Sequence, residues 1–131
     1  MNKEQIRKMI EGNAFANANN VEVIEDEEGN YLTRVTLSAD HKNPYGSAHG
    51  GLIYTLADAA AGFASCQVAD IPVTLHSDFH FIQNVKEGVI TAKATVLQKG
   101  GRIILLRVHV TSDTGVLLGE GTFTYYAIHS S

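Results

Sequence analysis

The sequence predicts an α+β fold in which a long central helix is wrapped by a curved antiparallel sheet, with a short helix at the N-terminus. Residues 51–68 carry apolar side chains at helical spacing and almost no charge, so this helix must be buried on most sides. A run of β-type segments follows it, each separated from the next by a few turn-forming residues. Two further β-type segments precede it. One sheet curved around one helix buries all of these segments together.

The N-terminal residues 1–20 are expected to form a helical segment of the same domain. Ile6, Met9 and Ile10 recur at helical spacing. This pattern predicts a short amphipathic helix from residue 3 to about residue 15, lying on the surface of the domain.

A hairpin and a loop are expected between this segment and the central helix. Residues 21–25 alternate as a strand does, residues 26–30 form a polar turn, and residues 31–37 resume with β-type side chains. Residues 38–48 contain proline and glycine and are interpreted as an irregular loop.

Four strands are expected after the central helix. Their connections are short and rich in turn-forming residues, which predicts an antiparallel meander in which each strand pairs with the next. Tyr125 and Tyr126 in the last strand are interpreted as packing residues. The expected strands are residues 73–82, 89–97, 103–111 and 116–128.

Length and composition limit the classes of protein. A chain of 131 residues fits one domain, 1–131, and 44% hydrophobic with 18% charged residues is ordinary for a globular protein. We expect a cytoplasmic protein without a membrane partner, because the N-terminus is polar and no stretch approaches the roughly 20 apolar residues of a membrane span. A net charge of −4, with ten scattered Lys and Arg residues, argues against nucleic acid as a partner. The single cysteine, Cys66, is expected to be a buried packing residue.

The start of the central helix carries the strongest functional signal. His49-Gly50-Gly51 opens the helix with unobstructed backbone N–H groups, where free donors and the helix dipole favour developing negative charge. Asp58 follows as a lone carboxylate within an Ala-rich stretch. Together these features indicate a site for activated acyl groups.

Three motifs give the chain a resemblance to a known family: Asn43-Pro44-Tyr45-Gly46, His49-Gly50-Gly51 and Leu56-Ala57-Asp58. With these motifs, and with its order of elements from residue 21 to residue 128, the chain is similar to the hotdog-fold acyl-CoA thioesterases of the phenylacetate-pathway, PaaI-like branch. The resemblance implies a hotdog fold and a homo-oligomer, either a dimer or a dimer of dimers (a homotetramer). It also implies an acyl-CoA substrate, with no metal and no organic cofactor.

The resemblance also implies roles for individual residues. Asp58 matches the catalytic carboxylate of the family, which acts as general base or nucleophile, and Gly50 matches the glycine whose N–H polarises the thioester carbonyl. His49 and Asn43 match positions that shape the site. Thr74 matches a position where relatives often place a hydroxyl that holds water or the aspartate. Gln83-Asn84 departs from the basic residue and proline usual in relatives, so the resemblance does not assign coenzyme A contacts to these two positions.

Four of the matched residues also have a structural interpretation. Asp58 could bond a neighbouring hydroxyl at a subunit contact, and His49 could fix the turn before the helix. Gly50 could serve simply to allow close packing, and Asn43 could serve simply to cap its loop. Gly50 and Asp58 lie about 12 Å apart along an ideal helix, so both reach one carbonyl only if they come from different subunits.

The segment from His76 to His80 contains the residue types of a Ser-His-Asp triad but is not expected to be a site. At strand spacing His76, Asp78 and His80 share one face, while Ser77 points to the other with Phe79. We therefore expect neither a Ser-His-Asp triad nor a metal site there.

The leading hypothesis is hydrolysis of an acyl-CoA thioester to the free acid and CoA. A hotdog dehydratase or hydratase is a second enzymatic interpretation, but the Asp/His motif on which that subgroup relies is not found in the sequence. A non-catalytic acyl-CoA or acyl-lipid binding module is the alternative of a different class. Such a module would need the pocket and the oligomer but not Asp58.

Overall fold

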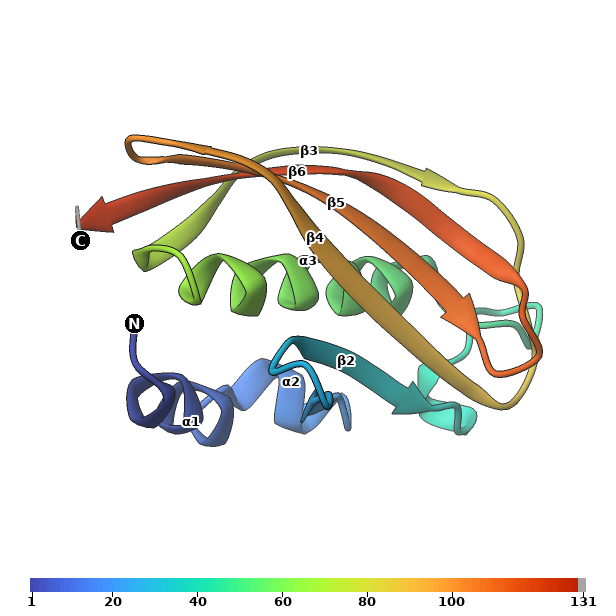
Figure 1. Cartoon of the computed structure of the whole chain (residues 1–131). Coiled ribbons are helices and arrows are strands. Elements are labelled where there is room, and N and C mark those ends of the chain that lie inside the picture. The colour runs from blue at the N-terminus through green and yellow to red at the C-terminus, as the bar shows by residue number, and fades with distance from the viewer. Residues whose placement is uncertain (130–131) are drawn as a thin grey trace.

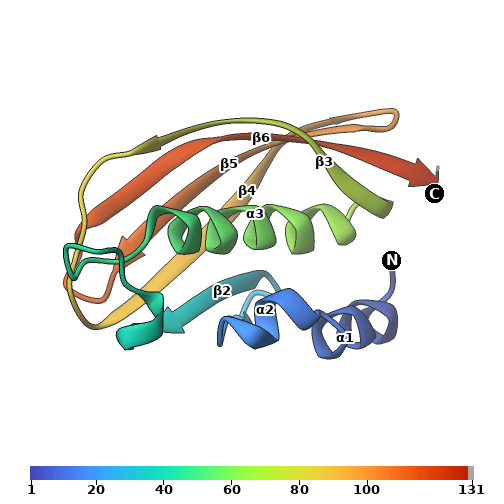
Figure 2. The same ribbon diagram turned by 180° about the vertical axis from the view of Figure 1, so that it is seen from behind.

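The central helix predicted at residues 51–68 is α3, Gly50–Cys66, in a computed structural model that describes residues 1–129. The sheet curves around it on one side and along both flanks (Figures 1 and 2). Leu56, Ala57, Ala60 and Ala61 of α3 are fully buried, which explains why this helix carries almost no charge. The last two residues of the expected 1–131 domain lie outside the described part.

One six-stranded antiparallel sheet forms the second layer. The strands lie in the order β1-β2-β4-β5-β6-β3, and together with α3 they confirm the predicted fold class. Inward side chains alternate with outward ones along most of β5 and β6 and supply much of the core, with Leu106, Val108 and Phe123 fully buried. The strands are β1 (Glu22–Glu25), β2 (Tyr31–Thr36), β4 (Val89–Gly100), β5 (Ile103–Ser112), β6 (Leu117–His129) and β3 (Asp70–Phe81).

The predicted meander is wrong for its first pair of strands. β4, β5 and β6 do follow one another across the sheet, but β3 pairs with β6 and lies at the far edge from β4. β4 pairs on its other side with β2. The connection after β3 therefore crosses from one side of the sheet to the other and is not a hairpin turn (Figure 1).

The predicted N-terminal helix is two helices. α1 (Lys3–Glu11) ends at Gly12, and α2 (Ala14–Ala18) begins after Asn13, whose side chain caps it. α1 lies along α3 and buries Ile6 against Phe63 and Cys66, as an amphipathic surface helix should.

The loop between β2 and α3 contains one short helical turn, η1 (Ala39–His41), within the region predicted to be irregular. The backbone of its His41 accepts a hydrogen bond from the His49 N–H at 2.9 Å, and this bond fixes where α3 begins. Within residues 1–129 no helix has the length and apolar character needed to span a membrane.

Candidate active site

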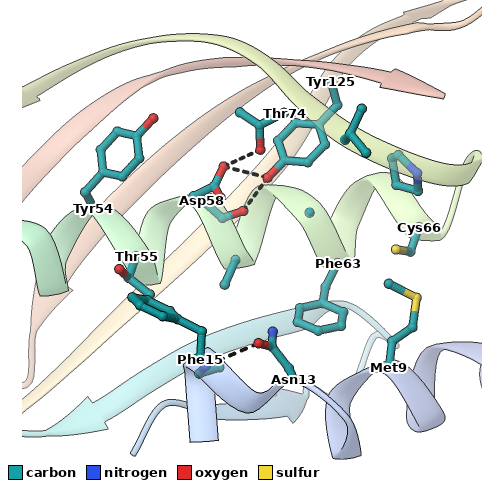
Figure 3. A pocket seen from close by; sticks show the side chains of 15 residues that line it. Met9, Asn13, Phe15, Tyr54, Thr55, Asp58, Phe63, Cys66, Thr74 and Tyr125 are labelled. Atoms are coloured by element: carbon teal, nitrogen blue, oxygen red, sulfur yellow. Dashed lines mark hydrogen bonds between the residues drawn. The ribbon is translucent and has the colours of Figure 1, made fainter. Parts of the chain in front are cut away.

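Asp58 lies in the middle of α3, and one of its two carboxylate oxygens is held by two hydroxyl groups. Thr74 Oγ1 donates to Asp58 Oδ1 at 2.8 Å, and Tyr125 Oη lies 2.7 Å from the same oxygen (Figure 3). The Tyr125 hydroxyl is also 2.7 Å from the backbone carbonyl of Asp58, so its single proton is shared between two acceptors. Within residues 1–129, Asp58 Oδ2 has no hydrogen-bond partner.

Tyr125 is a hydrogen-bond donor and not an acid at this site. Its ring is buried on the inner face of β6. Burial, and second the nearby Asp58 carboxylate, raise the pKa of Tyr125 well above its usual value. The phenol therefore stays protonated and supplies a permanent donor to Asp58.

Asp58, Thr74 and Tyr125 line a cavity of about 560 Å³, whose other polar side chains are Asn13, Tyr54 and Thr55. Its walls come from α3, from the start of β3 and from the N-terminal helices (Figure 3). Apolar side chains make up most of the lining, among them Met9, Phe15, Phe63, Cys66, Pro72 and Val73. A mostly apolar cavity with a few convergent polar groups is the usual form of a small-molecule site.

The first turn of α3 has one backbone N–H that is free and one that is capped. His49 is the N-cap, and its Nδ1 accepts from the Gly51 N–H at 2.9 Å. Among the described residues, the Gly50 N–H donates to no acceptor. The helix dipole adds to its attraction for a negatively charged oxygen.

Asn43 organises the loop before α3. Its Oδ1 accepts from the backbone N–H groups of Tyr45 and Ser47, at 2.9 and 3.0 Å. This is the loop-capping geometry that the sequence left as one of two interpretations. A contact between Asn43 and a substrate stays a prediction, as do the chemical roles of His49, Gly50, Asp58 and Thr74.

The structure brings Thr74 to Asp58, but it does not bring Gly50 there. Both Gly50 and Asp58 lie on the single helix α3, eight residues or about 12 Å apart along its axis. Within a single chain, the free Gly50 N–H and the free Asp58 oxygen therefore lie too far apart to contact the same carbonyl group.

Sequence reasoning missed Tyr125, which it interpreted as a packing residue. The hydroxyl bonds a residue 67 positions away, and no local pattern indicates such a partner. It also missed Asn13 and Phe15, which line the cavity because the second helix α2 turns them toward α3.

The predicted directions of the β3 side chains are confirmed. Ser77 faces inward, with its Oγ 2.5 Å from the Tyr54 hydroxyl, and Phe79 packs inward against Phe123. His76 and Asp78 are exposed on the outer face. Among residues 1–129, no group of three or more His, Cys, Asp or Glu side chains is placed to hold a metal ion.

A family model described as the thioesterase superfamily matches residues 45–118, more than half of the chain. The chain belongs to this superfamily. The matched region contains the helix start at Gly50, the carboxylate of Asp58 and the hydroxyl of Thr74, and it ends before Tyr125.

This thioesterase is similar to acyl-coenzyme A thioesterase PaaI of Escherichia coli K12, with 30% identity over 93 residues that cover 70% of this chain and 66% of the relative. The solved structure of E. coli PaaI, from the phenylacetic acid degradation operon, covers 98% of this chain and 94% of its own with a TM-score of 0.89, at 22% identity over that longer alignment. A hypothetical thioesterase protein of Streptococcus pneumoniae TIGR4, solved with coenzyme A, has a TM-score of 0.82 and 25% identity over 94% of this chain and 97% of its own. These likenesses confirm the PaaI-like hotdog fold.

Proposed function

We propose that this thioesterase hydrolyses an acyl-CoA thioester to the free acid and CoA. Two relatives support the choice of substrate: PaaI of E. coli is named an acyl-coenzyme A thioesterase, and the S. pneumoniae thioesterase was solved with coenzyme A. The observation that carries the proposal is the Asp58 carboxylate, which has one oxygen fixed by Thr74 and Tyr125 and the other free.

Asp58 acts as general base or as nucleophile. The two hydroxyl donors fix the plane of the carboxylate through Oδ1, so Oδ2 has a defined direction toward a bound reactant. A positioned group of this kind is what proton transfer or direct attack requires. Tyr125 and Thr74 are positioning residues in this scheme.

Gly50 of the partner subunit supplies the donor that polarises the thioester carbonyl. Its backbone N–H is free at a helix N-terminus, where it can bond an oxyanion without first giving up a partner. The separation of Gly50 and Asp58 along α3 requires that these two groups come from two chains. The functional unit is therefore at least a dimer.

The general-base reaction proceeds as follows. Asp58 Oδ2 takes a proton from water while the water oxygen attacks the thioester carbon, and the carbonyl oxygen becomes an oxyanion on the Gly50 N–H of the partner subunit. The C–S bond then breaks, and the proton on Asp58 passes to the departing sulfur to give the CoA thiol. In the nucleophilic alternative Asp58 Oδ2 attacks the thioester carbon, and the C–S bond breaks to give a mixed anhydride and the CoA thiolate. Water then hydrolyses the anhydride to the free acid and the Asp58 carboxylate, and the proton released passes to the thiolate.

The proposal includes the other properties implied by the resemblance. Hydrolysis by this scheme uses the protein's own groups with no resident metal or organic cofactor. A dimer of dimers and a cytoplasmic location are parts of the same proposal, and sedimentation equilibrium and cell fractionation would test them.

The first experiment measures release of free thiol from a panel of acyl-CoAs by the wild type and by Asp58→Asn. The panel includes phenylacetyl-, hydroxyphenylacetyl-, benzoyl- and C4 to C12 acyl-CoAs. Asparagine keeps an oxygen that accepts from Thr74 and Tyr125, but it neither takes a proton nor attacks a carbonyl. We expect turnover of at least one substrate, with a loss of about a hundredfold or more in the variant.

Binding of the same acyl-CoAs, measured by calorimetry, separates the enzyme from an acyl-CoA binding module. Wild type that binds but releases no thiol from any member of the panel would contradict hydrolysis and favour the binding module. Equal turnover by the wild type and Asp58→Asn would show that Asp58 takes no part in the reaction.

A further inference from the structure

Gly62 is a glycine in the interior of a helix that is built largely from alanine. Its neighbours in α3 include Ala59, Ala60, Ala61 and Ala64. In a helix interior, glycine lowers the folding equilibrium constant about fivefold relative to alanine. The backbone of Gly62 is regular helix and does not have the positive φ that favours glycine. The reason for a glycine here must therefore lie in the space beside it.

The space beside Gly62 is occupied by one side chain, that of Tyr125. A Cβ built at Gly62 would have its three nearest contacts with Tyr125 Oη at 3.3 Å, Cε2 at 3.6 Å and Cζ at 3.7 Å. The two carbon contacts are ordinary, but 3.3 Å is closer than nearly all contacts that a real Cβ makes. An added side chain would therefore press on the hydroxyl group and not on the ring.

This hydroxyl group is the one that bonds residue 58 twice. Its oxygen lies 2.7 Å from the backbone carbonyl oxygen of Asp58 and 2.7 Å from Asp58 Oδ1 (Figure 3). Asp58 and Gly62 are one helical turn apart on the same face of α3. Side chains of a helix tilt toward its N-terminus, so a side chain at residue 62 would project toward the place that the hydroxyl occupies.

Tyr125 has little freedom to move away from an added side chain. β6 lies between β5 and β3, where Tyr125 pairs with Ile104 on one side and with Thr74 on the other. Only 3% of Tyr125 is exposed, so its ring is enclosed as well. A displacement of a few tenths of an ångström would therefore fall on the hydroxyl group and on its hydrogen bonds to Asp58.

We propose that Gly62 is a positioning residue for Asp58, because its missing side chain leaves the gap through which the Tyr125 hydroxyl reaches the carboxylate. The reactive role of Asp58 rests on the proposed function, whereas the contact between residue 62 and Tyr125 does not. α3 loses helix stability at Gly62 and gains a fixed direction for Asp58 Oδ2.

Gly62 also lines the cavity, so an added side chain could act on a bound acyl group instead. The two explanations differ in how they depend on the Tyr125 hydroxyl. In Tyr125→Phe the oxygen is absent, and the nearest atom to an added Cβ is a ring carbon at an ordinary distance of 3.6 Å. Pressure on Tyr125 is therefore relieved in this variant, whereas crowding of the substrate is not.

A double-mutant cycle on activity separates these explanations. We expect Gly62→Ala to lower kcat about threefold or more in the wild type with little change in KM, and to lower it less than about 1.5-fold in the Tyr125→Phe background. Tyr126→Phe is the matched control background, because its ring lies on the outer face near Arg102 and the full loss should persist there. An equal loss in the Tyr125→Phe background, or no loss in the wild type, would overturn the proposal.

Urea unfolding of the same proteins tests the contact without any substrate. In the Tyr125→Phe background, Gly62→Ala should raise the folding equilibrium constant by about fivefold, which is the full gain expected in a helix. In the wild type this gain should be smaller by about threefold or more, because alanine presses on the hydroxyl that bonds Asp58. Equal gains in the two backgrounds would overturn the contact. Alanine favours the helix, so we expect the variant to fold.

The two measurements separate this proposal from the proposed function. A protein without thioesterase activity whose unfolding still couples residues 62 and 125 would uphold the contact while hydrolysis failed. An active protein in which Gly62→Ala leaves kcat unchanged and shows no such coupling would uphold hydrolysis and overturn the role of Gly62.

Discussion

At the scale of single residues, the Asp58 carboxylate is held in position by hydrogen bonds from two uncharged side chains. Thr74 of β3 and Tyr125 of β6 lie directly opposite each other in the β3–β6 strand pair and bond the same carboxylate oxygen. Hydrogen bonds to a charged group are about twice as strong as neutral ones, so the pair holds the carboxylate firmly. Among the described residues Asp58 Oδ2 has no partner, and it is the oxygen that the proposed reaction uses.

Tyr125→Phe tests this positioning. The variant keeps the buried ring and removes the donor that fixes Asp58, so we expect thioester turnover to fall about tenfold or more, in line with the strength of a charge-assisted hydrogen bond. Tyr126→Phe is the matched control, because its ring lies on the outer face of β6 near the Arg102 guanidinium. Equal activity in the two variants would show that the Tyr125 hydroxyl does not position the carboxylate.

Cys66 gives a prediction about stability at alkaline pH. Burial raises the pKa of the Cys66 thiol from 9.0 to about 11, so the unfolded chain loses this proton first as pH rises. The contribution of Cys66 is complete below pH 9 and is lost between pH 9 and pH 11, up to about 3 kcal/mol at 1.36 kcal/mol per pH unit. Urea unfolding at several pH values should show a steeper alkaline loss for the wild type than for Cys66→Ala. Parallel pH dependences would contradict this.

Residues of the site differ in how far the sequence predicts them. Asp58, Gly50 and Thr74 belong to motifs or to the start of a recognisable strand, and the structure places Thr74 on Asp58. Tyr125 has no such signal, because an inward-facing tyrosine in a strand has the same pattern whether it only packs or also donates a hydrogen bond. The hydrogen-bond partner of Tyr125 depends on the register of β6 against β3, and a sequence pattern does not specify that register.

At the scale of elements, the start of α3 gives the N–H groups of the adjacent residues Gly50 and Gly51 different hydrogen-bonding states. His49 caps the Gly51 N–H and leaves the Gly50 N–H free. The absence of a Cβ at Gly50 matters less than its N–H, because an added Cβ would make only ordinary contact with the Phe81 ring at 3.6 Å. Substitutions can therefore test the loss of the Gly50 N–H separately from the addition of a side chain.

Gly50→Pro removes this N–H and adds a ring, whose first carbon is controlled for by Gly50→Ala. Proline is well tolerated at the first helical position, and His49 already has the extended backbone, with φ −66° and ψ 135°, that proline requires of the preceding residue. We expect Gly50→Pro to lower kcat about 100- to 1000-fold while the melting temperature stays near the wild type, whereas Gly50→Ala keeps most activity. Comparable kcat values for the proline and alanine variants would contradict the oxyanion role.

The position of β3 is the element-scale feature that the sequence pattern did not predict. Turn-forming residues mark where a strand ends, but they do not indicate which strand the next one lies beside. The pattern of residues 84–88 is that of a hairpin turn, yet the chain there crosses the sheet and leaves β3 beside β6. The strand boundaries and the fold class were predictable because periodicity is local, and the pairing of β3 was not because it is a long-range contact.

At the scale of the whole molecule, the proposed function makes the single chain one half of a symmetric dimer. The curved sheet covers most of α3 and leaves open the side of the helix that contains Asp58, next to the unpaired edge of β3. An isologous dimer would cover this side and the edge together and would build two identical sites, each with Asp58 of one chain and Gly50 of the other. Activity should then depend on which chains are paired, and not only on which residues are present.

Mixing two inactive variants tests this dependence directly. Asp58→Asn retains the Gly50 donor, and Gly50→Pro retains the carboxylate, so a mixed dimer has one complete site and one site that lacks both groups. If subunits assort at random after co-expression or joint refolding, half of the dimers are mixed and half of their sites work, which gives about a quarter of wild-type activity. Each variant alone should remain near background, and addition of the two without subunit exchange should also stay there. Activity that never rises above the sum of the two separate variants, in preparations where mass spectrometry confirms mixed dimers, would place both groups in one chain and contradict the shared site.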